Sequence, residues 1–182
     1  MNPLKKSISQ TIITSIVFAL IIAAFAQLVI PLPLVPITGQ TLAIGLAATI
    51  LGSRKGMLTV ILYIMLGAVG LPVFSQLNSG LDAIVGVTGG FLIGFIPAAF
   101  LIGLYLEKTT FNIRNAFIAN TIGMFVILII GTSWLKLSTE LTWEAAFLGG
   151  FAPFIIGGLI KAFLAAWLGI VVREKLQSAK LI

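Results

Sequence analysis

The chain has 182 residues, of which 59% are hydrophobic and 9% are charged. Because ordinary soluble domains carry roughly 25% charged residues, this composition predicts a protein that crosses a membrane several times. The sequence contains no cysteine and no histidine, which excludes disulfides, thiol or imidazole catalysis and the commonest transition-metal ligands.

Six apolar stretches predict an all-α membrane protein, a six-helix bundle formed by a single domain over residues 1–182. About 20 helical residues cross a bilayer, and prolines or polar turns interrupt the apolar stretches. The second stretch is short for a full crossing, so we expect a short or tilted helix there. The predicted spans are residues 8–30, 39–52, 57–71, 88–105, 116–135 and 153–172.

The segment between the third and fourth spans, residues 73–87, is too polar to lie in lipid and too apolar for a solvated linker. We expect a loop folded back on the bundle. Asn78 and Asp82 are four residues apart, which puts them on one face if the segment is helical. Asp82 then either binds a polar ligand or caps the fourth span. Gln40, after the proline-rich loop at 31–38, is a second amide near the outer surface, either a ligand contact or an interfacial residue.

The distribution of charges supports the six-span arrangement. With six spans, nine of the eleven cations fall in one compartment, which the positive-inside rule makes the cytoplasm. Both termini are then cytoplasmic, and the loops at 31–38, 73–87 and 136–144 face outward, so a ligand site should open to the outside. The cations are scattered rather than gathered with aromatic residues, so no nucleic-acid partner is expected. The nine cations are Lys5, Lys6, Arg54, Lys55, Lys108, Arg114, Arg173, Lys175 and Lys180.

The last predicted span carries one ammonium, Lys161, roughly 12 Å from its start and near the membrane midplane. A lysine at the centre of a span costs about 2.5–3.5 kcal/mol on insertion scales, so the protein must offset it. Small residues share its helical face, notably Gly157 and Gly158, and leave room for a neighbouring helix or a ligand. Lys161 is therefore the first candidate ligand contact. The alternatives are snorkelling to the interface and pairing with a carboxylate.

Two patterns of small residues suit close packing of helices. Gly86, Gly90 and Gly94 recur every fourth residue near the start of the fourth span, and we interpret them as bundle packing. Ala19 and Ala23 form a second pair in the first span. By spacing alone this pair faces either the bundle or a partner protein.

No catalytic constellation is apparent in the sequence. It lacks the GxxxxGK[ST] phosphate loop and any pairing of a nucleophile with a base, so we expect neither an enzyme nor a bound cofactor or metal. Active transport would then draw its energy from another subunit or from an ion gradient. A stand-alone secondary transporter is the alternative class. An intramembrane carboxylate would mark it, and all five acidic residues are predicted in loops.

Three stretches resemble the signature sequences of the BioY family, the biotin-binding S components of energy-coupling factor (ECF) transporters. They are VPITGQTL at 35–42, GAVGLPVF at 67–74 and TGGFLIGF at 88–95. The resemblance implies a six-helix S component in the cell membrane that closes over a vitamin with its outward loops. It also implies association with an EcfT-type transmembrane coupling protein and two cytoplasmic ATPases. Ala19 and Ala23 match the family's AxxxA motif, and by that resemblance we expect them to contact the coupling protein.

The chain departs from the family pattern at two positions. The family commonly carries Asp-Leu-Ile-Lys in the sixth helix and Thr-Gly-Gly-Tyr in the fourth, whereas this sequence has Gly158 before Lys161 and Phe91 in place of the tyrosine. Because the missing acid would accept from the ureido N–H groups of biotin, a ureido-free ligand such as lipoate is the alternative to biotin. The expected ligand contacts are Lys161, Asn78, Asp82 and Gln40, with Phe74 and Phe91 as apolar walls and Gly158 as open space beside the lysine.

Overall fold

The computed structural model describes residues 3–179 and 181, with side chains from residue 10 onward, and it is 77% helical. Of the cations used to predict orientation, Lys180 and the side chains of Lys5 and Lys6 lie outside this description. The elements in chain order are α1 (Pro3–Ala26), β1 (Val29–Ile30), β2 (Ile37–Thr38), α2 (Gln40–Leu51), α3 (Ser53–Ala68), the 3-10 turn η1 (Ser75–Leu77), α4 (Leu81–Val85), α5 (Gly89–Lys108), α6 (Ile113–Ser138), α7 (Trp143–Gly150) and α8 (Phe154–Ser178).

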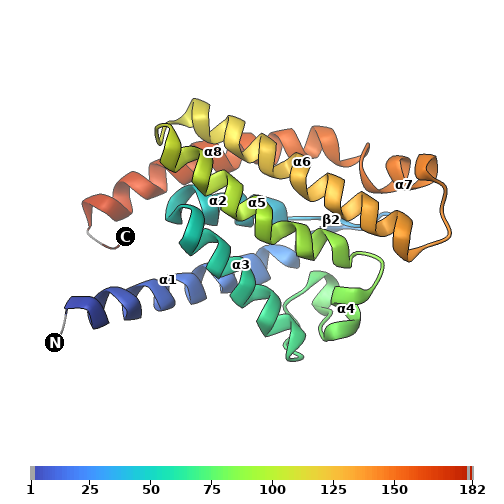
Figure 1. Cartoon of the computed structure of the whole chain (residues 1–182), viewed down its shortest axis with the longest axis horizontal. Helices are drawn as coiled ribbons and strands as arrows, with labels where there is room; N and C mark the ends of the chain where they lie inside the picture. The colour runs from blue at the N-terminus through green and yellow to red at the C-terminus, as the bar shows by residue number, and fades with distance from the viewer. Residues whose placement is uncertain (1–2, 180, 182) are drawn as a thin grey trace.

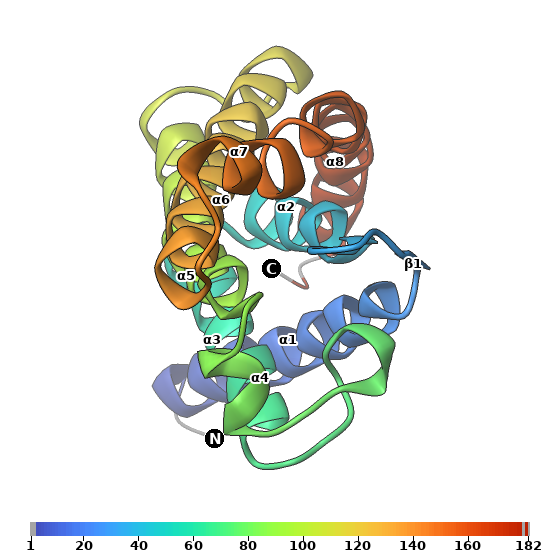
Figure 2. The ribbon, with the colours of Figure 1, turned by 90° about the vertical axis from the view of Figure 1, so that its right-hand side faces the viewer.

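The long helices form one bundle with α1 along its edge. α5 packs against α6, α8 packs against α2 and α6, and α3 packs against α5. α1 contacts α2 and α3 and lies along the outside of this group (Figure 1, Figure 2). The first turn of α1, the last turn of α8 and the α2–α3 and α5–α6 junctions lie at one end of the molecule, whereas α4 and α7 lie at the other (Figure 1).

In the described part of the chain, three helical stretches are long and apolar enough to cross a membrane: Gly89–Lys108, Ile113–Ser138 and Trp143–Ser178. The apolar part of α1, Gln10–Ala26, and α2 are shorter. α2 is thus as short as the second predicted span suggested. These stretches identify a helical membrane protein, while the count of six crossings stays a prediction.

The first predicted span ends earlier than expected, because the chain turns into a hairpin. α1 stops at Ala26, and β1 pairs antiparallel with β2, Val29 opposite Thr38 and Ile30 opposite Ile37. The prolines at 31, 33 and 36 lie in the connection between the two strands. Their lack of a backbone N–H therefore removes no hydrogen bond from the β1–β2 pair. Helix up to residue 30 was therefore a wrong prediction.

The connection between the second and third predicted spans, expected at 53–56, is reduced to a single residue, Gly52. Gly52 has a φ of 83°, a left-handed conformation that favours glycine, and α3 begins at the next residue. Ser53 donates its backbone N–H and its hydroxyl to the two carboxylate oxygens of Glu107, at 2.7 and 2.6 Å. Glu107 thus lies in the last turns of α5 and caps α3, and Glu174 lies within α8. The prediction that every acid is in a loop was wrong for these two.

The segment around residue 140 is more helical than predicted. α6 continues to Ser138, and α7 follows with Thr142 as its N-cap, whose Oγ1 accepts from the backbone N–H of Ala145 at 3.2 Å. α8 starts directly after Pro153, as expected, and extends to Ser178. The prediction missed these extensions because the segments contain polar residues, which indicated a loop. Charged and hydroxyl side chains are in fact tolerated at helix ends.

The glycine pattern of the fourth span serves packing at two of its three positions. A Cβ at Gly90 would lie 2.0 Å from the Trp134 side chain, and one at Gly94 would lie 3.4 Å from Ile127. Both glycines therefore face α6, as the packing interpretation requires. Gly86 lies before α5, and its carbonyl accepts from the Trp134 indole N–H at 2.9 Å.

Candidate functional site

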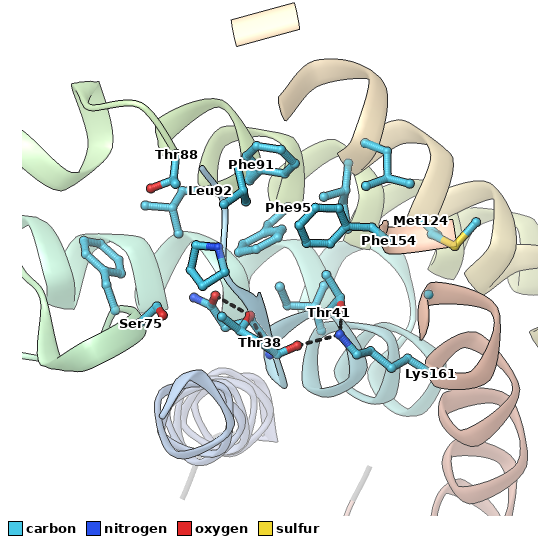
Figure 3. Close-up of a pocket in the computed structure, with 18 of the residues that line it drawn as sticks. Thr38, Thr41, Ser75, Thr88, Phe91, Leu92, Phe95, Met124, Phe154 and Lys161 are labelled. Carbon is cyan, nitrogen blue, oxygen red and sulfur yellow. Dashed lines mark hydrogen bonds between the residues drawn. The ribbon is translucent and has the colours of Figure 1, made fainter. Parts of the chain in front are cut away.

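A cavity of about 120 Å³ lies between the hairpin, α2, the loop after α3, α5, α6 and α8 (Figure 3). One water needs about 10–15 Å³, so the cavity holds several waters or one small organic molecule. Its described lining contains no Asp or Glu. Nor do the described residues contain any group of three or more His, Cys, Asp or Glu placed to bind a metal.

Aromatic rings supply much of the apolar lining. Phe91 lies 6.2 Å from Phe154 between ring centroids, and its ring rests on Gly131, where a Cβ would be 2.3 Å away. Phe74 is 3% exposed and rests in the same way on Gly67, at 2.0 Å from a Cβ there. The two predicted apolar walls therefore both line the cavity, each fixed by a facing glycine that sequence reasoning did not connect with it.

The Lys161 ammonium reaches across from α8 to the hairpin and α2. Its Nζ donates to the Thr38 carbonyl at 2.6 Å and lies 3.4 Å from Thr41 Oγ1 (Figure 3). Neither alternative from the sequence describes this arrangement, since the side chain is half-buried within the bundle and its partners are neutral oxygens. The positive charge in the cavity therefore has no carboxylate partner among the described residues that line it.

A chain of hydrogen bonds continues from Thr38 through the interior. The Thr38 hydroxyl donates to Gln40 Oε1 at 2.8 Å, and Gln40 Nε2 donates to the Tyr63 hydroxyl at 2.5 Å. Tyr63 in turn donates to the Val73 carbonyl at 3.1 Å. Gln40 is 5% exposed and Tyr63 is fully buried. Gln40 thus lines the cavity in a fixed orientation, as part of a network that joins α8, the hairpin, α2 and α3.

The loop after α3, residues 73–80, covers one side of the cavity. Phe74, Ser75 and Asn78 line the cavity, and Asn78 is also exposed, so it lies where the cavity opens. Gln27, half-buried just after α1, donates from Nε2 to the Phe74 carbonyl at 3.0 Å and accepts at Oε1 from the Leu77 N–H at 3.0 Å. One side chain therefore holds both ends of the η1 turn.

Asn78 and Asp82 do not share a helical face, as they would if the whole segment were helical. Asn78 is extended, and α4 begins only at Leu81, so the two residues do not share one helix. The Asp82 side chain is exposed and does not line the cavity. Thr88 is the N-cap of α5, so Asp82 does not cap that helix either. The capping expectation for Asp82 is thus wrong, and its contact with a ligand stays a prediction.

Gly158 lines the cavity, but the space beside it is filled. A Cβ at this position would lie 2.3 Å from Met124 Sδ, so the methionine thioether occupies the room that a side chain at 158 would need. The expected open space beside Lys161 is therefore reduced by a residue of α6. Sequence reasoning missed Met124, because a methionine in an apolar span carries no signal of its own.

Five polar residues of the lining were also missed: Thr38, Thr41, Ser75, Thr88 and Asn120. Thr38 and Thr41 flank Gln40 in the stretch already singled out, so their place in that motif was an available signal. Asn120 lies within the fifth predicted span, where a polar side chain in an apolar helix marks either helix packing or a site. That signal was present in the sequence.

The alanine pair of α1 does not form an exposed surface. Ala19 is 0% exposed and belongs to the core of the bundle, and Ala23 is half-buried beside it. In this arrangement Ala19 has no exposed surface, whereas Ala23 keeps part of its own, and contact of this pair with a coupling protein stays a prediction. The Ala19 methyl group lets α1 pack closely on its neighbours.

A family model described as "BioY family" matches residues 1–178. Several curated biotin transporters are similar over most of their length. BioY2 of Lactococcus lactis subsp. cremoris is 42% identical and the match covers 87% of each chain. The BioY protein of Thermotoga maritima is 36% identical over 87% of this chain and 92% of its own. A probable biotin transporter BioY of Lysinibacillus sphaericus is 34% identical over 98% of this chain and 94% of its own.

A solved structure has the same fold. The crystal structure of the S-component for biotin from an ECF-type ABC transporter superposes with a TM-score of 0.86 and 27% sequence identity. The match covers 96% of this chain and 95% of that one. The architecture described above is therefore that of a transporter component.

Proposed function

The chain belongs to the BioY family and is a transport protein rather than an enzyme, and on that premise we propose that it is the biotin-binding S component of an ECF transporter. The observation that carries the proposal is the Lys161 ammonium, which lines an aromatic cavity with no carboxylate in its described lining. An uncompensated ammonium favours a ligand that supplies oxygen acceptors, and the aromatic rings favour an apolar body.

The proposed orientation has six spans, both termini in the cytoplasm and the cavity opening outward. Its support is the alternation of helix junctions, since the first turn of α1, the last turn of α8 and the α2–α3 and α5–α6 junctions share one end (Figure 1). The cations gather at the same junctions. Arg54 and Lys55 lie in the first turn of α3, Lys108 ends α5, and Arg114 lies in the first turn of α6. The loop at 73–80 would then face the outside.

The proposed ligand contacts come from three sides of the cavity. Lys161 donates to an oxygen of the ligand with the N–H that Thr38 and Thr41 leave free. Gln40 and Asn78 offer amide groups, and Phe74 and Phe91 enclose the apolar part. Gly158 contributes backbone surface rather than space, because Met124 packs on it.

Biotin and lipoate are the two candidate ligands of the cavity. The names of the relatives and of the superposed structure support biotin. The thioether of Met124 beside Gly158 favours an apolar or sulfur-containing ring at that place, and both molecules carry one. The ureido group distinguishes them, since biotin has it and lipoate lacks it.

The test is direct binding of each ligand to the purified chain, with Lys161→Ala compared with Lys175→Ala. Lys175 lies on the same helix, is exposed and does not line the cavity, so it is the matched control. We expect Lys161→Ala to weaken binding by about 10- to 100-fold, because hydrogen bonds to charged groups contribute about 1.5–3 kcal/mol, and the control to bind normally. Unchanged affinity of Lys161→Ala contradicts the proposed role of the ammonium.

The proposed partners are an EcfT-type coupling protein and two cytoplasmic ATPases. Isolation of the tagged chain from its native membrane in mild detergent tests this, because the ATPases should be recovered with it. Uptake by the chain alone in proteoliposomes, driven by an ion gradient, would instead support the stand-alone secondary transporter.

A further inference from the structure

Asn120 of α6 lines the cavity, is 5% exposed, and has no part in the contacts proposed above. Its Nδ2 donates to Thr49 Oγ1 at 2.9 Å and to the Ala116 carbonyl at 2.8 Å. An amide nitrogen carries two hydrogens, so both of its donors are used within the protein.

These two bonds determine which way the amide faces. A backbone carbonyl can only accept, so the nitrogen faces Ala116 and the oxygen Oδ1 points away from it. Oδ1 lies over Gly45 of α2, where a Cβ would be 2.3 Å away. Among the described residues no N–H or O–H donates to Oδ1. Asn120, a buried residue of the cavity lining, thus carries an acceptor oxygen to which no described group of the protein donates.

Lys161 supplies a donor one helical turn from this acceptor. Its Nζ lies 3.4 Å from Thr41 Oγ1, and Gly45 is four residues further along the same helix. Residues four apart share a face and are separated by one turn, about 5.4 Å. On the side of α2, the cavity therefore presents an ammonium donor and an amide acceptor about one turn apart.

A cyclic urea presents the complementary pair, a carbonyl oxygen and a neighbouring N–H. With hydrogen bonds of about 2.9 Å at each end, such a group has the size to bridge a donor and an acceptor that lie about one helical turn apart. We propose that Asn120 Oδ1 accepts a hydrogen bond from a ureido N–H of the ligand and thereby selects ureido ligands over ureido-free ones. This inference rests on the proposed function. The selection is strong because a ligand without the N–H leaves the buried oxygen unpaired.

The experiment measures binding of biotin, which has the ureido group, and lipoate, which lacks it, to the purified chain and to Asn120→Leu. The leucine has a similar size but no acceptor. We expect biotin affinity to fall by about 10- to 100-fold and lipoate affinity to stay the same or rise. Thr121→Val is the control, since Thr121 is the next residue of α6 and its buried hydroxyl, which has no partner in the described chain, lies off the cavity.

A second variant tests the same role of Asn120 in case the Asn120→Leu protein does not fold. Thr49 does not line the cavity, and Thr49→Val keeps its shape while removing the oxygen that orients the Asn120 amide. We expect this variant to weaken biotin binding by about 3- to 10-fold and Thr49→Ser to restore it, with lipoate binding unchanged. A purely structural role would reduce binding of both ligands together.

The outcomes separate the inference from the proposed function. Loss of biotin affinity alone, in either the Asn120→Leu or the Thr49→Val chain, supports the role of Asn120. Equal losses for the two ligands, or no loss, overturn it while leaving the biotin-binding function intact. If the unmodified chain binds neither ligand, the proposed function fails and the inference fails with it.

Discussion

The cavity is enclosed by two regions that are held in different ways. On the helical side, Lys161, Thr38, Gln40 and Tyr63 form a hydrogen-bonded chain in which Gln40 and Tyr63 are almost wholly buried. On the other side, the loop at 73–80 is partly exposed. The half-buried Gln27 holds its η1 turn, and the Tyr63 hydroxyl and the Gly67 carbonyl bind only its two ends, at Val73 and Gly80. The first region joins helices that are distant in sequence, whereas the second is a single short loop that covers the cavity.

The backbone shows the same difference. Gln76 and Leu77 in the loop have φ of 60° and 58°, a left-handed conformation that costs a residue with a side chain about 1–2 kcal/mol. Such conformations persist only where neighbouring contacts impose them. Exposed segments with strained backbone and few buried contacts belong to the least stable parts of a protein. The loop is therefore the part of the cavity wall that we expect to open, and the helical side the part that defines the ligand's position.

The largest effect should come from breaking the helical side at Gln40. Gln40→Leu leaves the Thr38 hydroxyl without its acceptor and removes one of the two partners of the Tyr63 hydroxyl, and a buried group left unsatisfied costs about 1–3 kcal/mol. We expect ligand affinity to fall by about 10- to 100-fold and the melting temperature of the purified chain to drop. Tyr63→Phe, which removes one hydroxyl only, should show a smaller loss. If neither variant changes affinity, the network does not position the ligand.

A smaller and kinetic effect should come from releasing the loop at Gln27. Gln27→Ala removes the two hydrogen bonds to the loop, to the Phe74 carbonyl and from the Leu77 N–H, each contributing about 0.5–1.5 kcal/mol, and also the bond to the Ala23 carbonyl within the same segment. We expect the ligand to dissociate about 5- to 10-fold faster with little change in association rate, as measured by stopped-flow fluorescence.

Gln177→Ala is the matched control, because Gln177 is exposed near the end of α8 and far along the chain from the loop. Its dissociation rate should equal that of the unmodified chain. A loss in melting temperature of Gln27→Ala without any change in dissociation would mean that the residue stabilises the fold and does not hold the loop at 73–80.

The smallest effect should come from Leu77→Gly, and its sign should be opposite. Glycine adopts the φ of 58° without the steric cost, but it loses about 0.5–1 kcal/mol more conformational entropy on folding. We expect the loop at 73–80 to open about 2- to 3-fold more slowly as the net result, which is measured as a lower rate of ligand dissociation. Faster dissociation in this variant would show that the leucine side chain, and not the backbone conformation, matters.

The sequence by itself determined the class of the protein, the approximate helices and several members of the site. Apolar content and proline positions are properties of a segment, so they predict a helix or its end without knowledge of the neighbours. For the same reason Lys161 and Gln40 could be chosen, since a lysine in an apolar span and a polar motif beside prolines are visible locally, whereas Phe74 and Phe91 were chosen from the signature stretches. The signature stretches at 35–42, 67–74 and 88–95 then predicted the family that the chain matches.

Only the tertiary structure decided which side chains meet. Lys161 and Thr38 are 123 positions apart, and Asn120 and Thr49 are 71 apart, so their hydrogen bonds depend on how the helices are rotated against one another. The same rotation buried Ala19, put Met124 beside Gly158 and left Asp82 exposed. In a bundle where every helix is apolar on most faces, hydropathy does not mark the face that turns inward. Close packing between helices determines which face of each helix turns inward, and this packing exists only in the folded chain.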